Sequence, residues 1–233
     1  LGDVYKRQIT FYAKWKPNQY NVVCNLDGGY VDNYPMNING TIDMVHAYGV
    51  SEALPLVPEK TGYSFLGWVL IDLDEGTYTK KIPADLDHDA TFVAKWSKND
   101  YQISYDLDGG NVDAALTSVY NIDTETITLP TPTKEGYSFS KWIDLDTNNE
   151  IKSIVKGTVG DKKLKALWVA NSYKINYTLN KKDAVLPDSA DNNRTFGKDI
   201  TLATPSKQGY VFDGWYDNAD LTGSASVSYT HLR

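Results

Sequence analysis

Histidine, cysteine and clustered carboxylates are the residues of this chain that could carry out chemistry. The sequence contains three histidines, His46, His88 and His231, and one cysteine, Cys24. No two histidines stand at the spacing of a metal site, and no serine or cysteine is paired with a histidine in a recurring catalytic motif. The residues therefore predict no active site, no metal site and no bound cofactor.

Two acidic stretches resemble the beginning of a calcium-binding loop, DLDGGN from Asp106 and DLDTNNE from Asp144. An EF-hand loop needs glycine at its sixth position and glutamate at its twelfth. The first stretch has Asn111 and Thr117 at these positions, and the second stretch also has neither residue. Both stretches are therefore interpreted as polar turns.

An aromatic heptapeptide occurs three times and dominates the remaining sequence pattern. It reads GYSFLGW at residues 62–68, GYSFSKW at 136–142 and GYVFDGW at 209–215. A catalytic site requires a single copy of its motif, whereas a motif that recurs along the chain indicates a structural unit that recurs. The heptapeptide therefore favours a tandem-repeat protein over an enzyme.

The repeated unit extends on both sides of the heptapeptide. An alternating segment that opens with tyrosine precedes each copy and begins at Tyr20, Tyr101 and Tyr173. Closing segments, TFVAKW and KLKALW, follow the first two copies, and a further closing segment, TFYAKW, ends at Trp15. One period is roughly 70 to 80 residues, near the size of a small domain. The repeat signature consists of Gly62, Tyr63, Phe65, Trp68, Trp96, Gly136, Tyr137, Phe139, Trp142, Trp168, Gly209, Tyr210, Phe212 and Trp215.

These segments predict how the chain is organised. The expected parts are the closing strand of a preceding repeat at 9–15, complete units at 20–96 and 101–168, and an incomplete third unit at 173–226. Residues 1–8 and 227–233 are expected to be the translation of a sequencing adapter, because DVYKRQ and VSYTHL resemble reading frames of a transposon end. Under that expectation His231 has no function, and the protein continues beyond both ends.

The overall composition restricts the partners of the chain. The net charge is −7, whereas nucleic-acid binding needs a clustered basic surface, so no nucleic-acid partner is predicted. The same charge disfavours binding to anionic membranes. Mean hydropathy is −0.43 and no apolar run approaches the length of a membrane span, so direct membrane insertion is not expected.

The opening segments have the clearest strand pattern. In the second unit, Tyr101, Ile103, Tyr105 and Leu107 alternate with polar residues, so that one face is apolar. The glycine pair that follows is typical of a turn that ends a strand. Cys24 stands at the position of Tyr105 in the first unit, and it is predicted to be a small core residue.

The heptapeptide is expected to form a strand with a bulge. Tyr63 and Phe65 share a face, whereas Trp68 is out of phase with them. A bulge near Gly67 would bring the three side chains to one face, since glycine is frequent at bulges. Lys141 replaces this glycine in the second unit.

The variable middle is expected to add a further strand, as TITL from Thr126 and DITL from Asp199. In the first unit an insertion lies here, and Ile42, Val45 and Tyr48 are spaced as in a short helix. The predicted fold class is mainly β, with a small antiparallel sheet of about four strands per unit and little helix.

The tryptophans of the heptapeptide, Trp68, Trp142 and Trp215, admit two interpretations. Exposed aromatic faces stack on sugars, which would make the chain a carbohydrate-binding array. A tryptophan that recurs at a strand position is more typical of core packing, and this interpretation is favoured.

The whole pattern resembles the Listeria–Bacteroides repeat family, the B-repeat of internalin-type proteins. PEKTGYSFLGW followed by ATFVAKW carries the resemblance. It implies small β-grasp-like domains, mainly β within the α+β class, repeated in tandem and without enzymatic activity. The chain departs from the family pattern at Lys141 and at NKK from Asn180, where glycine is usual.

The resemblance also implies a location and a role. Such repeats occur in bacterial cell-surface, cell-envelope or secreted proteins, where they act as stalk, spacer or adhesin. The implied partners are host or environmental glycans or surface receptors, and the oligomeric state is left open. Two alternatives stand beside this reading, a carbohydrate-binding array and the accessory repeats of a larger secreted enzyme.

Overall fold

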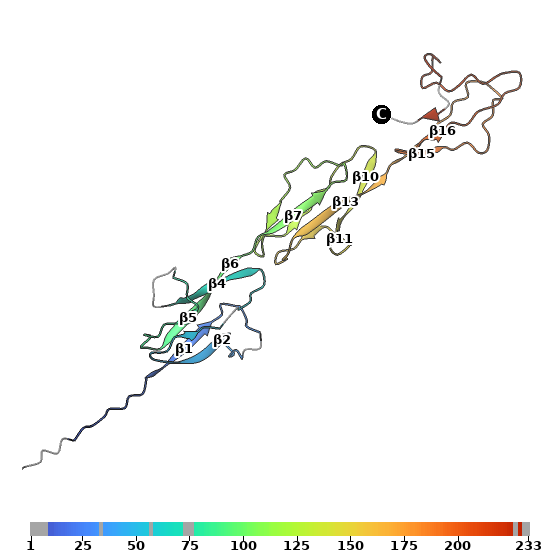
Figure 1. Ribbon diagram of the computed structural model, residues 1–233. Helices are drawn as coiled ribbons and strands as arrows, with labels where there is room; N and C mark the ends of the chain where they lie inside the picture. Colours follow the sequence, from blue (N-terminus) through green and yellow to red (C-terminus); the bar gives the residue numbers. More distant parts are fainter. Residues whose placement is uncertain (1–8, 33–34, 56–57, 72–76, 226–227, 230–233) are drawn as a thin grey trace, which may run out of the picture. The chain divides into compact units, whose positions relative to one another are not determined.

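A computed structural model describes residues 9–32, 35–55, 58–71, 77–225 and 228–229 of the chain (Figure 1). The backbone divides into two compact units, Leu1–Asp100 and Tyr101–Arg233. All regular secondary structure within the described residues is β-strand. The prediction of a mainly β fold is therefore confirmed. Residues 1–8, 227 and 230–233, where the adapter was predicted, lie outside the described residues.

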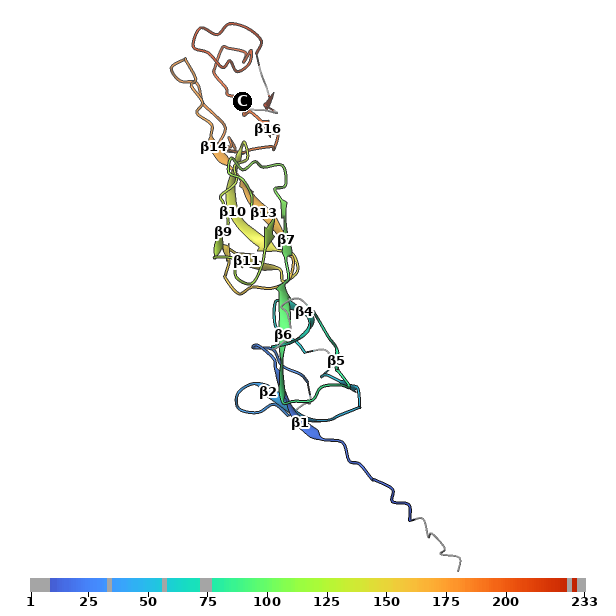
Figure 2. The same cartoon turned by 90° about the vertical axis from the view of Figure 1, so that its left-hand side faces the viewer.

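Unit 1 contains one four-stranded sheet with the strand order β2-β1-β6-β4. Its strands are β1 (Gln19–Asn25), β2 (Thr41–Ala47), β4 (Tyr63–Leu70) and β6 (Ala90–Lys98), and β3 (Glu52–Ala53) pairs separately with β5 (Lys81–Ile82). The opening strand β1 and the closing strand β6 run parallel, whereas the other pairs are antiparallel (Figures 1 and 2). The sheet is therefore mixed rather than wholly antiparallel.

The insertion in unit 1 forms strand β2, and the short helix allowed by the apolar spacing is absent from residues 41–47. All seven residues of β2 pair with β1. Ile42 and His46 are buried, whereas Val45 is 58% exposed, which is a two-residue period. Because a complete ladder with β1 satisfies the backbone, strand pairing overrides the helical spacing.

Unit 2 repeats this arrangement in residues 101–170. A five-stranded sheet has the order β11-β10-β13-β7-β8. Its strands are β7 (Tyr101–Asp106), β8 (Val119–Tyr120), β10 (Tyr137–Asp144), β11 (Asn149–Ile151) and β13 (Lys162–Ala170), and β9 (Ile127–Thr128) pairs with β12 (Ser153–Ile154). The opening strand β7 again lies parallel to the closing strand β13. TITL therefore supplies a strand, β9, as predicted.

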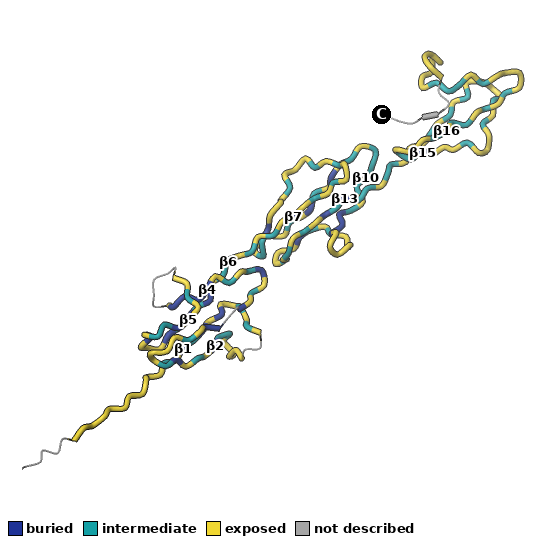
Figure 3. The backbone as a smooth tube through the Cα atoms, in the orientation of Figure 1, coloured by how far each residue is buried: buried dark blue, intermediate teal, exposed yellow. Residues whose placement is uncertain are grey.

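The third repeat, within unit 2, has shorter strands. β14 (Ser172–Lys174) pairs with β15 (Asn193–Thr195), and β16 (Ile200–Thr201) pairs with β17 (Ser228–Tyr229). DITL thus also supplies a strand, β16. No hydrophobic side chain is buried among residues 172–225, as the exposed and intermediate colours of this region show (Figure 3).

The bulge predicted in the heptapeptide is confirmed in both complete repeats. The register of β4 against β6 shifts between Phe65 and Gly67, and that of β10 against β13 shifts between Phe139 and Lys141. Gly67 has φ of 148°, and a Cβ there would lie 2.8 Å from Cβ of Tyr78. Lys141 forms its bulge without a positive φ, so this position requires glycine in unit 1 but not in the second repeat. The third repeat has Gly214 here, with φ of 143°.

Each complete repeat has its own hydrophobic core. The core of unit 1 consists of Val22, Cys24, Leu26, Ile42, Leu54, Trp68, Leu70, Ile82, Leu86, Ala90, Phe92 and Ala94. The core of the second repeat consists of Ile103, Tyr120, Leu129, Trp142, Ile154, Leu164 and Ala166. The closing strands β6 and β13 lie at the centre of their sheets, and alternate residues of each strand enter the core.

Candidate functional site

The signature side chains of unit 1 form an aromatic wedge, which we define as the phenylalanine of the heptapeptide between two tryptophans. The Phe65 ring centroid lies 5.6 Å from that of Trp68 and 5.4 Å from that of Trp96, with both pairs edge-on. Trp68 is only 1% exposed. Edge-on pairs contribute about 0.5–1.5 kcal/mol each beyond the burial of their area. The wedge therefore ties β4 to the closing strand β6.

The second repeat has the same wedge. The Phe139 ring lies 5.8 Å from Trp142 and 5.7 Å from Trp168, and Trp142 is 3% exposed. Gly62 and Gly136 stand in the turn before each strand with φ of 79° and 76°, and the tyrosines that follow them are half-buried.

Each indole N–H of the wedge finds a backbone acceptor. Trp68 donates to the Pro55 carbonyl at 3.2 Å, and Trp96 donates to the Leu26 carbonyl at 3.2 Å. In the second repeat Trp142 donates to Pro130 at 2.8 Å and Trp168 donates to Leu107 at 3.1 Å. A buried N–H without an acceptor is costly, so these bonds fix the orientation of the rings.

A lysine two residues before the heptapeptide completes this arrangement, and we call it the lysine latch. Lys60 Nζ donates to the Asp27 carbonyl at 2.7 Å, and it lies 4.8 Å from the Tyr63 ring centroid and 5.8 Å from that of Trp96. This lysine is not among the residues predicted above from the sequence. The signal was available, because Lys60, Lys134 and Lys207 stand at the same position in all three copies.

The latch of the second repeat matches that of the first. Lys134 Nζ donates to the Asp108 carbonyl at 2.6 Å, and it lies 4.6 Å from the Tyr137 ring centroid and 5.7 Å from that of Trp168. The latch therefore joins the opening turn, the heptapeptide and the closing strand.

The glycine pair in the opening turn is explained by two separate requirements. Gly28 has φ of 80°, which side chains rarely adopt. A Cβ at Gly29 would lie 2.5 Å from Cζ2 of Trp96, so the second glycine makes room for the indole. Gly109 repeats the first requirement with φ of 80°, and Gly110 repeats the second at 2.4 Å from Trp168.

The third repeat has a wedge with one tryptophan. The Phe212 ring lies 5.3 Å from Trp215, and the Tyr177 ring lies 4.9 Å from it. Trp215 donates its N–H to the Ala203 carbonyl at 2.8 Å and is half-buried. The sequence-predicted residues Gly209 and Tyr210 lie at its start, and Tyr210 is 63% exposed.

The opening turn of the third repeat differs from the alignment made from the sequence. NKK from Asn180 was aligned with the glycine-containing turn, but the latch lysine Lys207 donates to the Lys182 carbonyl, the acceptor position of the other two latches. Val185 and Ser206 form the bridge that follows the turn. Residues 183–184 therefore occupy the position of the glycine pair, after a two-residue insertion.

A cleft of about 720 Å³ opens in the third repeat. One wall comes from the opening segment and includes Asn176, Thr178 and Leu179, and the other comes from the heptapeptide at residues 210–217. Ala184 lies between the two walls at the opening turn. The cleft is thus lined by the same segments that flank the closing strand in the two complete repeats.

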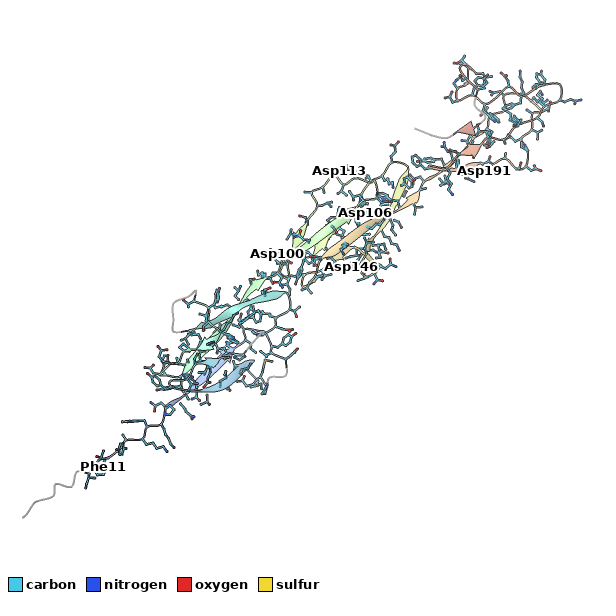
Figure 4. The ribbon with its side chains drawn as sticks, in the orientation of Figure 1. Phe11, Asp100, Asp106, Asp113, Asp146 and Asp191 are labelled. Atoms are coloured by element: carbon cyan, nitrogen blue, oxygen red, sulfur yellow. The ribbon has the colours of Figure 1, made fainter. Side chains whose placement is uncertain are left out.

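The acidic stretches form turns, in agreement with the interpretation above. Asp106 accepts the Asp108 N–H at 2.9 Å, and this bond together with Lys165 lowers the pKa of the Asp106 carboxyl. Asp106 and Asp146 lie on different segments of unit 2 (Figure 4). Within the described part of the chain, no three His, Cys, Asp or Glu side chains are grouped as metal ligands.

Asp144 is a buried carboxylate, 4% exposed, and it lies 3.0 Å from Lys162 Nζ. Burial by itself raises the pKa of Asp144, but hydrogen bonds from Lys162 and from the Asp146 N–H outweigh burial and hold that pKa below its ordinary value. This charge pair joins the end of β10 to the start of β13, which is a structural role.

Of the three histidine and cysteine side chains of unit 1, Cys24 and His46 are buried, whereas His88 is exposed and its Nδ1 lies 2.9 Å from a carboxylate oxygen of the adjacent Asp87. Cys24 is fully buried, and burial, together with the nearby Asp43 charge, raises its pKa to about 12, so the thiol is unreactive at neutral pH. His46 is also fully buried, and its Nδ1 lies 4.0 Å from a Glu52 carboxylate oxygen. Neither residue is exposed to a substrate.

Comparisons with known proteins agree with the repeat structure. The family model of the Listeria-Bacteroides repeat domain matches residues 20–95, 101–166 and 173–231. Two proteins of Evansella cellulosilytica are each 32% identical to the chain: one described as a membrane protein, covering 95% of this chain, and one described as a Gly-rich membrane protein, covering 96%. Internalin H of Listeria monocytogenes is 34% identical over 46% of this chain.

The relatives are longer than this chain. The matched regions span 32% and 24% of the two Evansella cellulosilytica proteins and 19% of Internalin H. No solved structure matches the chain. Within the described residues, no helix is long and apolar enough to cross a membrane.

Proposed function

Because this chain belongs to the Listeria-Bacteroides repeat domain family, we propose that it is a non-catalytic stalk that withstands mechanical tension in a bacterial cell-surface or secreted protein. Relatives described as membrane proteins and an internalin support the surface location. The recurring residues support the structural role, since they form the wedge and the latch of every complete repeat.

The parallel pairing of the opening and closing strands carries this proposal. In unit 1, Val22–Asn25 of β1 pair with Ala90–Val93 of β6. A force that pulls the two ends of the unit apart acts along both strands in opposite directions. Because the strands are parallel neighbours, their hydrogen bonds are sheared together rather than opened one at a time. The β7–β13 pair gives the second repeat the same geometry.

The joints between repeats are short and fastened. β6 ends at Lys98 and β7 begins at Tyr101, so two residues separate the closing strand from the next opening strand. Asn99 N–H donates to the Gly62 carbonyl at 3.0 Å, and its side-chain oxygen accepts Ser64 Oγ at 2.5 Å. Such a joint passes tension directly from one sheet into the chain that enters the next.

The second joint is fastened in the same way. Asn171 N–H donates to the Gly136 carbonyl at 2.9 Å, and the Asn171 side-chain oxygen accepts Ser138 Oγ at 2.6 Å. One residue separates β13 from β14. A repeated joint of this kind suits an array that holds a distal domain away from the cell surface.

The alternative of a carbohydrate-binding array gains no support from the heptapeptide tryptophans of the two complete repeats, whereas Trp215 of the third repeat is half-buried. Trp68 and Trp142 are 1% and 3% exposed, so neither presents a ring face on which a sugar could stack.

We also propose that the fold of each complete repeat is similar to a β-grasp fold. The parallel first and last strands support it, although no helix crosses the sheet within the described residues.

Single-molecule force spectroscopy of the full chain tests the stalk. Unfolding of the two complete repeats should appear as separate events, and each event should release the contour length of the repeat, about 260 Å or 230 Å at ~3.3 Å per residue, less the distance between its ends when folded. Gly110→Ala should lower the unfolding force of the second repeat alone, leaving unit 1 as an internal control. Extension without force peaks, or complete repeats that open at forces no higher than the third repeat, would remove the basis of the proposal.

A further inference from the structure

The main sheet of the second repeat ends at the joint to the third repeat. The last pair of the β10–β13 ladder joins Tyr137 to Ala170. The Asn171 N–H donates to the Gly136 carbonyl at 2.9 Å and extends this ladder by one bond. The end of a ladder opens more easily than its middle, because fewer contacts hold it closed. A segment that packs against this end therefore adds stability where the sheet is weakest.

The β14–β15 hairpin of the third repeat brings Phe196 to this end of the sheet. Ser172 pairs with Thr195, so the residues that flank this pair, Asn171 and Phe196, also lie opposite each other. The Phe196 N–H donates to the Asn171 carbonyl at 2.8 Å. Asn171 is thus bonded through its N–H to the second repeat and through its carbonyl to the third. Rotation of the chain at Asn171 requires that at least one of these bonds break.

The Phe196 ring covers the backbone of Gly136. A Cβ at Gly136 would overlap three atoms of this ring, so the ring lies directly on the glycine. The ring centroids of Phe196 and Tyr137 are 5.4 Å apart with an interplanar angle of 76°, which is an edge-on pair. Gly197 also approaches Tyr137, since a Cβ there would lie 3.4 Å from the tyrosine hydroxyl oxygen. Both aromatic side chains are half-buried as a result.

Tyr137 connects this contact to the interior of the second repeat. The latch residue Lys134 has its Nζ 4.6 Å from the Tyr137 ring centroid and 5.7 Å from that of Trp168. The Tyr137 ring is therefore held between the lysine latch and Phe196. Removal of Phe196 exposes the tyrosine that the latch contacts, so the effect is expected to reach the closing strand.

We propose that the start of the third repeat caps the sheet of the second repeat through Phe196, so that these two repeats are energetically coupled and the joint between them does not bend freely. The docking surface consists of Gly136, Tyr137 and Asn171, and the partner that it fits is an aromatic side chain at the end of a β-hairpin. This inference goes beyond the stalk function and does not rest on it, because the contact couples the repeats whether or not the chain bears tension.

Scanning calorimetry of the full 233-residue chain tests the coupling. Phe196→Ala should lower the midpoint of thermal unfolding of the second repeat by about 4–8 °C, the shift that loss of one edge-on aromatic pair produces in a domain of this size. Lys198→Ala is the matched control, because Lys198 is exposed and lies two residues further along the chain. The control variant and the transition of unit 1 should be unchanged. A second repeat that unfolds at the native temperature in Phe196→Ala would overturn the proposal.

A double-mutant cycle separates the direct contact from a general loss of structure in the third repeat. Tyr137→Leu is measured in the native chain and in the Phe196→Ala chain. Because each substitution removes the same aromatic pair, the double variant should lower the midpoint of the second repeat by several degrees less than the sum of the single variants. Additive shifts would show that Phe196 does not act through Tyr137, which contradicts the capping contact.

Nuclear relaxation of the backbone amides tests whether the joint bends. In the native chain, the amides of β10 and β13 and those of the β14–β15 hairpin should report one rotational correlation time. In Phe196→Ala the hairpin should report a shorter correlation time than the sheet. A hairpin that already moves independently in the native chain would refute the restricted joint. The stalk proposal would survive that result if the complete repeats still unfolded as separate force peaks, so the two proposals can fail separately.

Discussion

Gly110→Ala provides the sharpest test of how the opening turn and the closing strand fit together. The added Cβ would lie 2.4 Å from Cζ2 of Trp168 and 3.0 Å from the Thr133 carbonyl oxygen. Overpacking of this kind costs about 1–3 kcal/mol. Displacement of the indole also weakens its hydrogen bond to Leu107, which adds about 0.5–1.5 kcal/mol. We therefore expect the second repeat to lose about 2–4 kcal/mol of unfolding free energy.

Gly109→Ala is the matched control for this substitution. Gly109 has φ of 80°, but its Cβ would meet only the end of the Lys134 side chain, at 3.8 Å. Gly109→Ala should therefore lower the free energy of unfolding only by the strain of placing alanine in a left-handed backbone conformation, about 1–2 kcal/mol.

Differential scanning calorimetry of the full chain measures both effects, and hydrogen exchange of the β13 amides assigns the transition. In a domain of this size, each kcal/mol of lost unfolding free energy lowers the midpoint of thermal unfolding by about 4–8 °C. Gly110→Ala should therefore lower the midpoint of the second repeat by about 10 °C or more and leave unit 1 unchanged. If Gly110→Ala lowers the free energy of unfolding no more than Gly109→Ala does, the packing of the Trp168 indole does not require glycine at position 110.

Three further predictions follow from individual contacts. Lys134→Met should destabilise the second repeat by about 1–2 kcal/mol in the same calorimetric assay, because it removes the charged hydrogen bond to Asp108 and the cation–π contacts. An unchanged unfolding temperature of this repeat would show that the lysine latch is not stabilising. The free energy of unfolding of the second repeat should fall as pH falls through the lowered pKa of Asp144. The ionised Asp144 carboxylate is stabilised in the folded state, so its contribution to this free energy is fully present only above the ordinary, unfolded pKa. In an acid titration followed by circular dichroism, Asp144→Asn should therefore show a smaller loss of stability with falling pH. Cys24, whose pKa is raised to about 12, should react with a thiol reagent only on unfolding, so rapid labelling of the native chain would contradict its burial.

The sequence was sufficient for features that depend on local pattern. Alternation in the opening segments predicted strands, and the phase break at Trp68 predicted the bulge that lies between Phe65 and Gly67. These features are predictable because a strand has a period of two and a bulge shifts that period by one. The core role of Cys24 could be predicted because repetition shows which residues replace it.

Features that depend on distant pairing were not predictable in the same way. The parallel contact between β1 and β6 joins residues almost 70 positions apart, and no local pattern encodes its direction. The helical spacing around Ile42 gave way to strand β2 because β1 offers a complete ladder. The lysine latch could have been found from repetition alone, but its role depends on a turn that lies 33 residues away in unit 1 and 26 residues away in the second repeat.

The opening turn, the heptapeptide and the closing strand depend on one another. Trp96 packs over Gly29, donates to the Leu26 carbonyl and lies beside Lys60, so a single side chain of the closing strand completes contacts with both earlier segments. The opening turn, the heptapeptide and the closing strand of a complete repeat are therefore held together by one shared set of contacts, and loss of the Trp96 side chain is expected to weaken all three segments at once.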